Sequence, residues 1–162
     1  MGKSGGGPIR KRWTFSIITI LIIVSICIVI GVVGRNSSKV LHPSNYEIYT
    51  ADTIKMEAEE QAYSSNIASI KTIVTSSVEL GYGMDFELEF CKDGRWYTME
   101  MKDTSFISLT GIIAAGTPHE IDYHIHDHYR TPLKAGRYRI VQEFSSEELG
   151  ICYCAAEFVI QW

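Results

Sequence analysis

A run of histidines in the carboxyl-terminal third of the chain is the clearest candidate for metal chemistry. His124, His126 and His128 occupy alternate positions after Ile121 and Tyr123, which themselves alternate. If this segment is one extended strand, the three imidazoles project from one face and can share a zinc or copper ion. One alternative is a solvated strand face or loop in which histidine happens to be frequent. Another is a surface change triggered by acid, because histidine is the side chain that most readily changes charge near physiological pH.

The cysteines offer a second kind of chemistry. Cys27 falls within a long apolar run, which leaves Cys91, Cys152 and Cys154. Cys152 and Cys154 are two positions apart on a predicted strand, so their side chains point the same way and rarely bridge each other. Cys91 could pair with one of them across strands, leaving an odd thiol. We favour the simpler interpretation, in which Cys152 and Cys154 are small core residues on the face of Phe158.

Known catalytic motifs are absent from the sequence. It contains no Gly-x-Ser-x-Gly elbow, no His-Glu-x-x-His helix and no phosphate-binding loop. Acidic pairs such as Glu147 and Glu148 are typical of solvated turns. The aromatic residues Trp96, Tyr97 and Tyr138 could form a ligand surface, although such residues more often fill a core or lock a turn. We therefore expect no catalytic residue, no cofactor and no enzymatic activity.

Charge is distributed unevenly along the chain. Four cations and no acid precede residue 13, so the other 15 − 4 = 11 cations face all 19 acids, and residues 13–162 carry a net charge of −8. Phosphate binding needs a basic face, so this balance argues against nucleic acid as a partner of the folded part. It also argues against adhesion of that part to anionic lipid.

Residues 13–34 form an uncharged apolar run of 22 residues, rich in Ile and Val. As a helix rising about 1.5 Å per residue, the run is about 33 Å long, enough to cross a hydrocarbon core of roughly 30 Å. Arg10, Lys11 and Arg12 directly precede it, and positive flanks stay in the cytoplasm. The sequence predicts a single-pass anchor in the cell membrane with its amino end inside. The alternative is a signal peptide whose cleavage releases a secreted protein.

These segments divide the chain into four predicted parts. Residues 1–12 are a basic cytoplasmic stub, residues 13–34 a transmembrane helix, residues 35–52 a polar linker and residues 53–162 an extracellular domain. In the last part, apolar and polar residues alternate with a period of two, which is the strand pattern. The predicted strands cover residues 54–59, 67–75, 86–90, 96–101, 121–126, 138–144 and 152–162.

Turn signals separate these strands. Asp93-Gly94 favours a hairpin, because both residues tolerate a positive φ, and Lys134-Ala135-Gly136 is a second turn. From Cys152 to Trp162 we expect one unbroken apolar face, and residues 104–117 could hold a short helical turn. About seven strands over about 110 residues predict an all-β sandwich, in which each sheet buries its apolar face against the other.

Five short motifs occur in order along this region. They are Tyr82-Gly83, Phe86-Glu87-Leu88-Glu89, Gly94-Arg95-Trp96-Tyr97, Leu133-Lys134-Ala135-Gly136-Arg137-Tyr138-Arg139 and Ala156-Glu157-Phe158-Val159-Ile160. In this order they resemble the bacterial immunoglobulin-like domain of Gram-positive surface proteins. The resemblance covers about residues 53–162 and implies an immunoglobulin-like β-sandwich at a cell surface. It implies no catalytic residues.

The expected function is therefore that of a membrane-anchored extracellular immunoglobulin-like domain with a non-catalytic binding or structural role at the bacterial cell surface. Its expected partners are the lipid bilayer, through residues 13–34, and an extracellular protein or cell-wall ligand. The alternative function is a metal-binding or pH-sensing surface protein that uses His124, His126 and His128. We predict no site residues beyond these three candidates.

Overall fold

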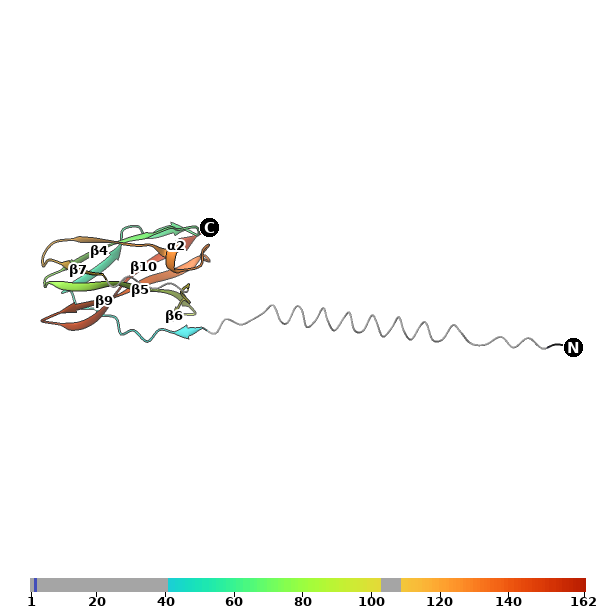
Figure 1. The fold of residues 1–162 in the computed structure, drawn as a ribbon, viewed down its shortest axis with the longest axis horizontal. Coiled ribbons are helices and arrows are strands. Elements are labelled where there is room, and N and C mark those ends of the chain that lie inside the picture. The colour runs from blue at the N-terminus through green and yellow to red at the C-terminus, as the bar shows by residue number, and fades with distance from the viewer. Residues whose placement is uncertain (1, 3–40, 103–108) are drawn as a thin grey trace. The chain divides into compact units, whose positions relative to one another are not determined.

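A computed structural model of the chain contains two β-sheets that enclose one hydrophobic core (Figure 1). It describes Gly2, residues 41–102 and residues 109–162. The predicted transmembrane helix, the rest of the predicted stub and residues 35–40 lie outside the described residues. Within the described part, no helix is long and apolar enough to cross a membrane. The fold below is that of the compact unit Leu41–Trp162.

The larger sheet has seven strands. Its order is β1-β6-β5-β9-β10-β3, and β7 pairs with β5 beside this path. Strands β3 and β10 run parallel, and the other neighbours are antiparallel. The strands of this sheet are β1 (His42–Pro43), β3 (Ala62–Ser64), β5 (Leu80–Lys92), β6 (Arg95–Thr98), β7 (Thr110–Ile113), β9 (Gly136–Ser146) and β10 (Gly150–Gln161).

The smaller sheet has three antiparallel strands in the order β2-β4-β8. They are β2 (Ile54–Ala58), β4 (Ile70–Ser76) and β8 (His119–Tyr123). Residues of β2 and β4 alternate between buried and exposed, so each strand presents one face to the core. Inward side chains of both sheets belong to the same core, which confirms the predicted all-β sandwich.

Both predicted turns form where the sequence indicates. Asp93 and Gly94, with φ of 51° and 76°, connect β5 to β6, as expected for residues that tolerate the left-handed region. Strand β9 begins at Gly136, and its residues at alternate positions from Tyr138 to Phe144 are buried. The next strand, β10, pairs with β9 along nearly its whole length.

Residues 41–52, which the sequence assigns to the linker, pack on the domain. Strand β1 pairs with β6, Ile48 forms a β-bridge with Tyr153, and the compact unit begins at Leu41. This segment attaches through backbone hydrogen bonds to strand edges, and such bonds require no apolar periodicity. For this reason the polar composition of residues 41–52 did not indicate that they pack on the domain. We call residues 41–52 the strap.

The chain after β8 differs from the predicted strand. Strand β8 ends at Tyr123, opposite the first residue of β4, Ile70, so no partner strand remains to extend the ladder. Instead, residues Ile125–His128 form the single helical turn α2, and the backbone N–H of His126 donates to the carbonyl of Ala68 at 3.0 Å.

Two further expectations need correction. Residues Thr110–Ile113, part of the segment that could hold a short helical turn, form strand β7, while residues 103–108 lie outside the described part. Trp162 is 91% exposed, because β10 ends at Gln161 and the buried face stops at Ile160.

Candidate functional site

The outer face of the seven-stranded sheet carries a buried ion pair. The register places Glu89 of β5 opposite Arg139 of β9, and alternation turns both side chains away from the core. Arg139 Nε donates to Glu89 Oε2 at 2.7 Å, and Glu89 is fully buried. Thr98 Oγ1 donates to the other carboxylate oxygen at 3.3 Å, and the ring of Trp96 lies 4.4 Å from the guanidinium carbon. These contacts connect the three neighbouring strands β5, β6 and β9.

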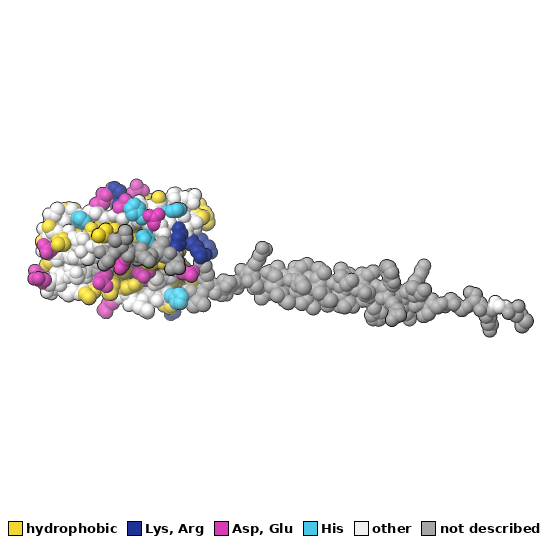
Figure 2. All heavy atoms as spheres, viewed as in Figure 1, with side chains coloured by type: hydrophobic (Ala, Val, Ile, Leu, Met, Phe, Trp, Pro, Cys, Tyr) yellow, Lys and Arg dark blue, Asp and Glu magenta, His cyan; other side chains and the backbone are white. Residues whose placement is uncertain are grey.

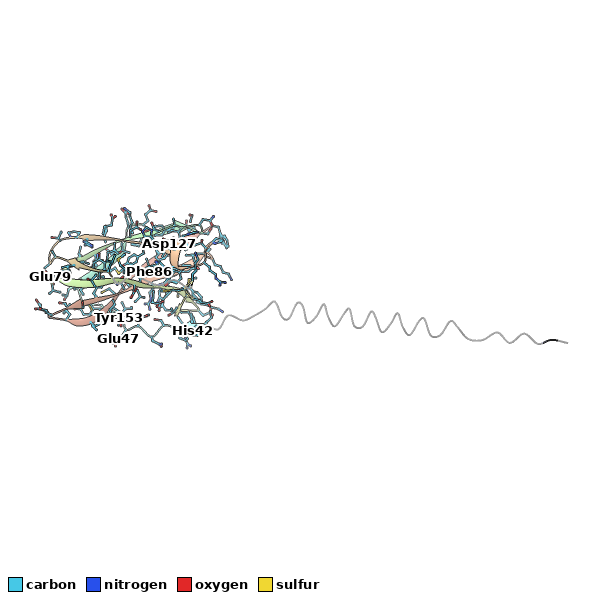
Figure 3. All side chains as sticks on the ribbon, viewed as in Figure 1. His42, Glu47, Glu79, Phe86, Asp127 and Tyr153 are labelled. Atoms are coloured by element: carbon cyan, nitrogen blue, oxygen red, sulfur yellow. The ribbon has the colours of Figure 1, made fainter. Side chains whose placement is uncertain are left out.

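The strap crosses this outer face. The backbone N–H of Ser44 donates to the carbonyl of Trp96 on β6 at 3.0 Å, and that of Tyr49 donates to the carbonyl of Tyr153 on β10 at 2.7 Å. Because β5 and β9 lie between β6 and β10, the strap passes over both of them. Figure 3 shows the strap residue Glu47 next to Tyr153, on the same side of the domain as β9.

A groove of about 340 Å³ opens between the strap and the sheet. The ring of Tyr46, from the strap, packs at a tilt on that of Tyr153, with centroids 4.9 Å apart. Val141 is only 2% exposed although it lies on the outer face, opposite Glu87. We call this hollow the strap groove and define it by Tyr46, Asp85, Glu87, Met101, Val141, Glu143 and Tyr153.

The rim of the strap groove is acidic, with carboxylates from Asp85, Glu87 and Glu143. Tyr153 Oη donates to Glu143 Oε2 at 2.9 Å. Glu87 is half-buried, and its pKa is raised, first by burial and second by the nearby charge of Glu89. Burial and then the charge of Glu87 likewise raise the pKa of the Tyr46 phenol. The groove therefore disfavours a further negative charge.

The predicted histidine cluster is not assembled on one face. His124 precedes α2, whereas His126 and His128 lie two positions apart on the helical turn and project to different sides. His126 Nδ1 lies 3.7 Å from Asp127 Oδ1, and the ring of His128 packs edge-on against Phe86. Across residues 41–102 and 109–162, no group of three or more His, Cys, Asp or Glu could hold a metal ion. The shared strand face was a wrong expectation, because the strand ends first.

The cysteines of the domain are free thiols, so the alternative cross-strand pairing of Cys91 is not formed. Cys152 and Cys154 are 7% and 3% exposed within the core, which confirms the interpretation of both as core residues. Burial, with a smaller effect of Cys152, raises the pKa of Cys154 to about 12. That thiol stays protonated and is a poor nucleophile at neutral pH.

The three aromatic candidates have separate roles. Tyr138 locks a turn, because its Oη donates to the carbonyl of Lys134 at 2.9 Å, the arrangement known as a tyrosine corner. Tyr97 stacks on Phe90, with ring centroids 5.6 Å apart. Of these three, Trp96 contributes to the outer face, where it covers the guanidinium of Arg139.

Sequence reasoning missed the residues that build the strap groove. Glu87 stands at an outward position of an alternating strand, as do Glu89 and Arg139 of the buried ion pair, and a charged residue at such a position is normally exposed to solvent. Tyr46 lies in the segment assigned to the linker. The sequence did offer one sign, the two aromatic residues Tyr46 and Tyr49 in this short polar segment. Large rings in a free linker have no apolar surface to pack on, so their presence indicates that the segment packs on the domain.

Comparison with known proteins gives distant structural similarities and one family. No curated protein matches the sequence. The sporulation control protein Spo0M of Bacillus subtilis has a TM-score of 0.40 at 13% identity over 70% of this chain, which spans about half, 51%, of that protein. A superoxide reductase (neelaredoxin) of Ignicoccus hospitalis has a TM-score of 0.31 at 13% identity, covering 67% of this chain and 80% of that one. The family model of the bacterial Ig-like domain matches residues 50–158, and the chain belongs to this family.

Proposed function

We propose that the chain is a single-pass membrane protein that presents its Ig-like domain outside the bacterial cell as a non-catalytic binding module. Membership of the bacterial Ig-like family supports a surface setting. The basic cluster at residues 10–12, followed by the uncharged run at residues 13–34, supports an anchor with its amino end in the cytoplasm. The structural observation that carries the binding role is the strap groove, a preformed hollow whose lining comes from five separate segments of the domain.

The short tether gives this proposal a geometric consequence. The folded unit begins at Leu41, so residues 35–40 alone separate it from the end of the apolar run at Gly34. Six extended residues span at most about 20 Å. The domain is then held near the outer leaflet, where it can meet partners at the membrane surface or in the adjacent cell wall.

The test is protease accessibility on intact cells that produce the full chain with an epitope tag at each end. We expect added protease to remove the carboxyl-terminal tag while the amino-terminal tag survives until the cells are lysed. Protection of the carboxyl-terminal tag in intact cells would refute the proposed orientation. Recovery of the domain from the medium would support the alternative, a secreted protein released by signal cleavage.

A further inference from the structure

The strap groove combines an apolar floor with an acidic rim. Val141 forms part of the floor, and the tilted rings of Tyr46 and Tyr153 stand beside it. Partly exposed aromatic faces of this kind accept the apolar stem or the charged head of a long basic side chain. The groove is thus shaped for a group that is apolar along its length and polar at its tip.

The rim carries negative charge that the domain itself does not neutralise. Within the described residues, none of the groove carboxylates takes part in an ion pair. Two cations on the outer face of β9 have carboxylate partners outside the groove, Arg139 with Glu89 and Arg137 with Glu157. Figure 2 shows acidic side chains spread over the face in view, whereas the basic side chains gather mainly at one end of the domain. A ligand that enters the groove must therefore supply its own positive charge.

We propose that the strap groove docks a lysine or arginine side chain presented by a polypeptide partner. The stem of that side chain packs along the paired rings of Tyr46 and Tyr153, and its cationic head reaches Glu87 and Glu143. A neutral sugar would leave the half-buried carboxylate of Glu87 unpaired, and a bare metal ion would leave the aromatic walls uncovered. This inference rests on the proposed function, because the partner must reach the domain outside the cell.

The electrostatics of Glu87 support this choice of ligand. Its pKa is raised because burial removes water from the carboxylate and Glu89 adds a like charge. A cation placed beside Glu87 opposes both effects, because it stabilises the charged carboxylate. Charge pairing at a partly desolvated site of this kind contributes more than pairing on an open surface.

The test measures peptide binding to the full chain in nanodiscs of zwitterionic lipid. The probe is a fluorescein-labelled lysine–glycine peptide, and its match is the same peptide with every lysine acetylated, which keeps the stem and removes the charge. We expect the lysine peptide to bind and the acetylated peptide to bind at least about tenfold more weakly. Equal binding of the two peptides would overturn the proposal.

A matched pair of variants places the site. Glu87→Gln removes one charge from the groove, and Glu57→Gln removes one from the opposite sheet, where Glu57 is exposed and paired with Lys55. We expect about a tenfold loss for Glu87→Gln and less than about a twofold loss for Glu57→Gln. Equal losses would mean general attraction to an acidic domain and would refute the groove as the binding site.

Tyr46→Ala, with circular dichroism to confirm folding, should also weaken binding about tenfold by removing one wall of the groove.

The outcomes separate this inference from the proposed function. The groove proposal fails if the lysine peptide does not bind. It also fails if the competitors glucosamine or Ca²⁺ displace the peptide equally well from the wild-type chain and from Glu87→Gln. The protease-accessibility result is unaffected by either outcome, so the surface-display proposal can stand without it.

Discussion

Arg137 and Arg139 are neighbours on the same face of β9, yet their surroundings differ. The side chain of Arg139 is 9% exposed and pairs with the fully buried Glu89, whereas Arg137 is 60% exposed and pairs with the exposed Glu157. Removing one member of a buried ion pair leaves the other charge without compensation. Arg139→Leu should therefore lower the free energy of unfolding by about 3–5 kcal/mol, and Arg137→Leu by less than about 1 kcal/mol, in urea titrations.

A double variant distinguishes charge from packing at this position. If the uncompensated carboxylate causes the loss, Glu89→Leu combined with Arg139→Leu should recover most of the stability, because neither charge remains. A double variant as unstable as Arg139→Leu alone would show instead that the stacking of Arg139 on Trp96 dominates.

Cys154 gives a prediction of pH dependence at the same scale. Its pKa rises from an ordinary 9.0 to about 12, mainly through burial, whereas Cys91 is half-exposed. At pH 8 the thiolate fraction of Cys154 is then about a thousandfold below that of an ordinary thiol, and iodoacetamide should label it more slowly than the more accessible Cys91. Peptide mass spectrometry of the native chain measures both sites. Equal labelling of Cys91 and Cys154 would contradict the burial.

The same shift determines the sign of a stability effect. A thiol whose pKa is raised on folding stabilises the folded state fully below pH 9, and this contribution is lost as the pH rises towards 12. The urea midpoint should therefore fall through this range, and less steeply in Cys154→Ala than in the wild-type chain.

Among the elements, β7 meets β5 through a close contact that only glycine permits. A Cβ on Gly111 would lie 2.4 Å from the ring of Tyr82, whose Oη lies 3.1 Å from His119 Nε2 on the smaller sheet. Gly111→Ala should displace this ring, loosen a contact between the sheets and destabilise the domain by about 1–3 kcal/mol in urea unfolding. Gly83→Ala is the matched control, because its nearest new contact is at 3.9 Å, and should change stability by less than about 0.5 kcal/mol.

The elements also show how far the sequence could predict this fold. Alternation within one strand identifies a face to be buried, so β2, β4, β9 and β10 follow from the sequence. What alternation cannot show is which strand lies opposite. The burial of Glu89 depends on Arg139, 50 residues later, and the end of β8 depends on where β4 begins. The candidate site was missed for the same reason, since its walls meet only after the strands pair.

At the scale of the whole molecule, the family match and the structure place the start of the domain at different residues. The family match begins at residue 50, inside the strap. The compact unit begins at Leu41, and the strap contributes Tyr46 to the groove that Val141 also lines and places Ser44 Oγ 3.3 Å from Arg139 Nη2. A chain that lacks residues 1–40 should keep the stability of the domain. A chain that lacks residues 1–52 should lose about 2–4 kcal/mol, since it exposes an apolar floor and a partly desolvated charge.

Urea unfolding of these two truncated chains, followed by tryptophan fluorescence, measures the difference directly. Trp96 is a suitable reporter, because the strap hydrogen-bonds to its carbonyl and Arg139 lies against its ring. Equal midpoints would show that the strap adds no stability to the domain. The strap could then detach from the sheet while the domain stays folded, and the strap groove would lose the wall that Tyr46 provides. A lower midpoint for the shorter chain would mean that residues 41–52 are an integral part of the domain, so that the groove is present whenever the domain is folded.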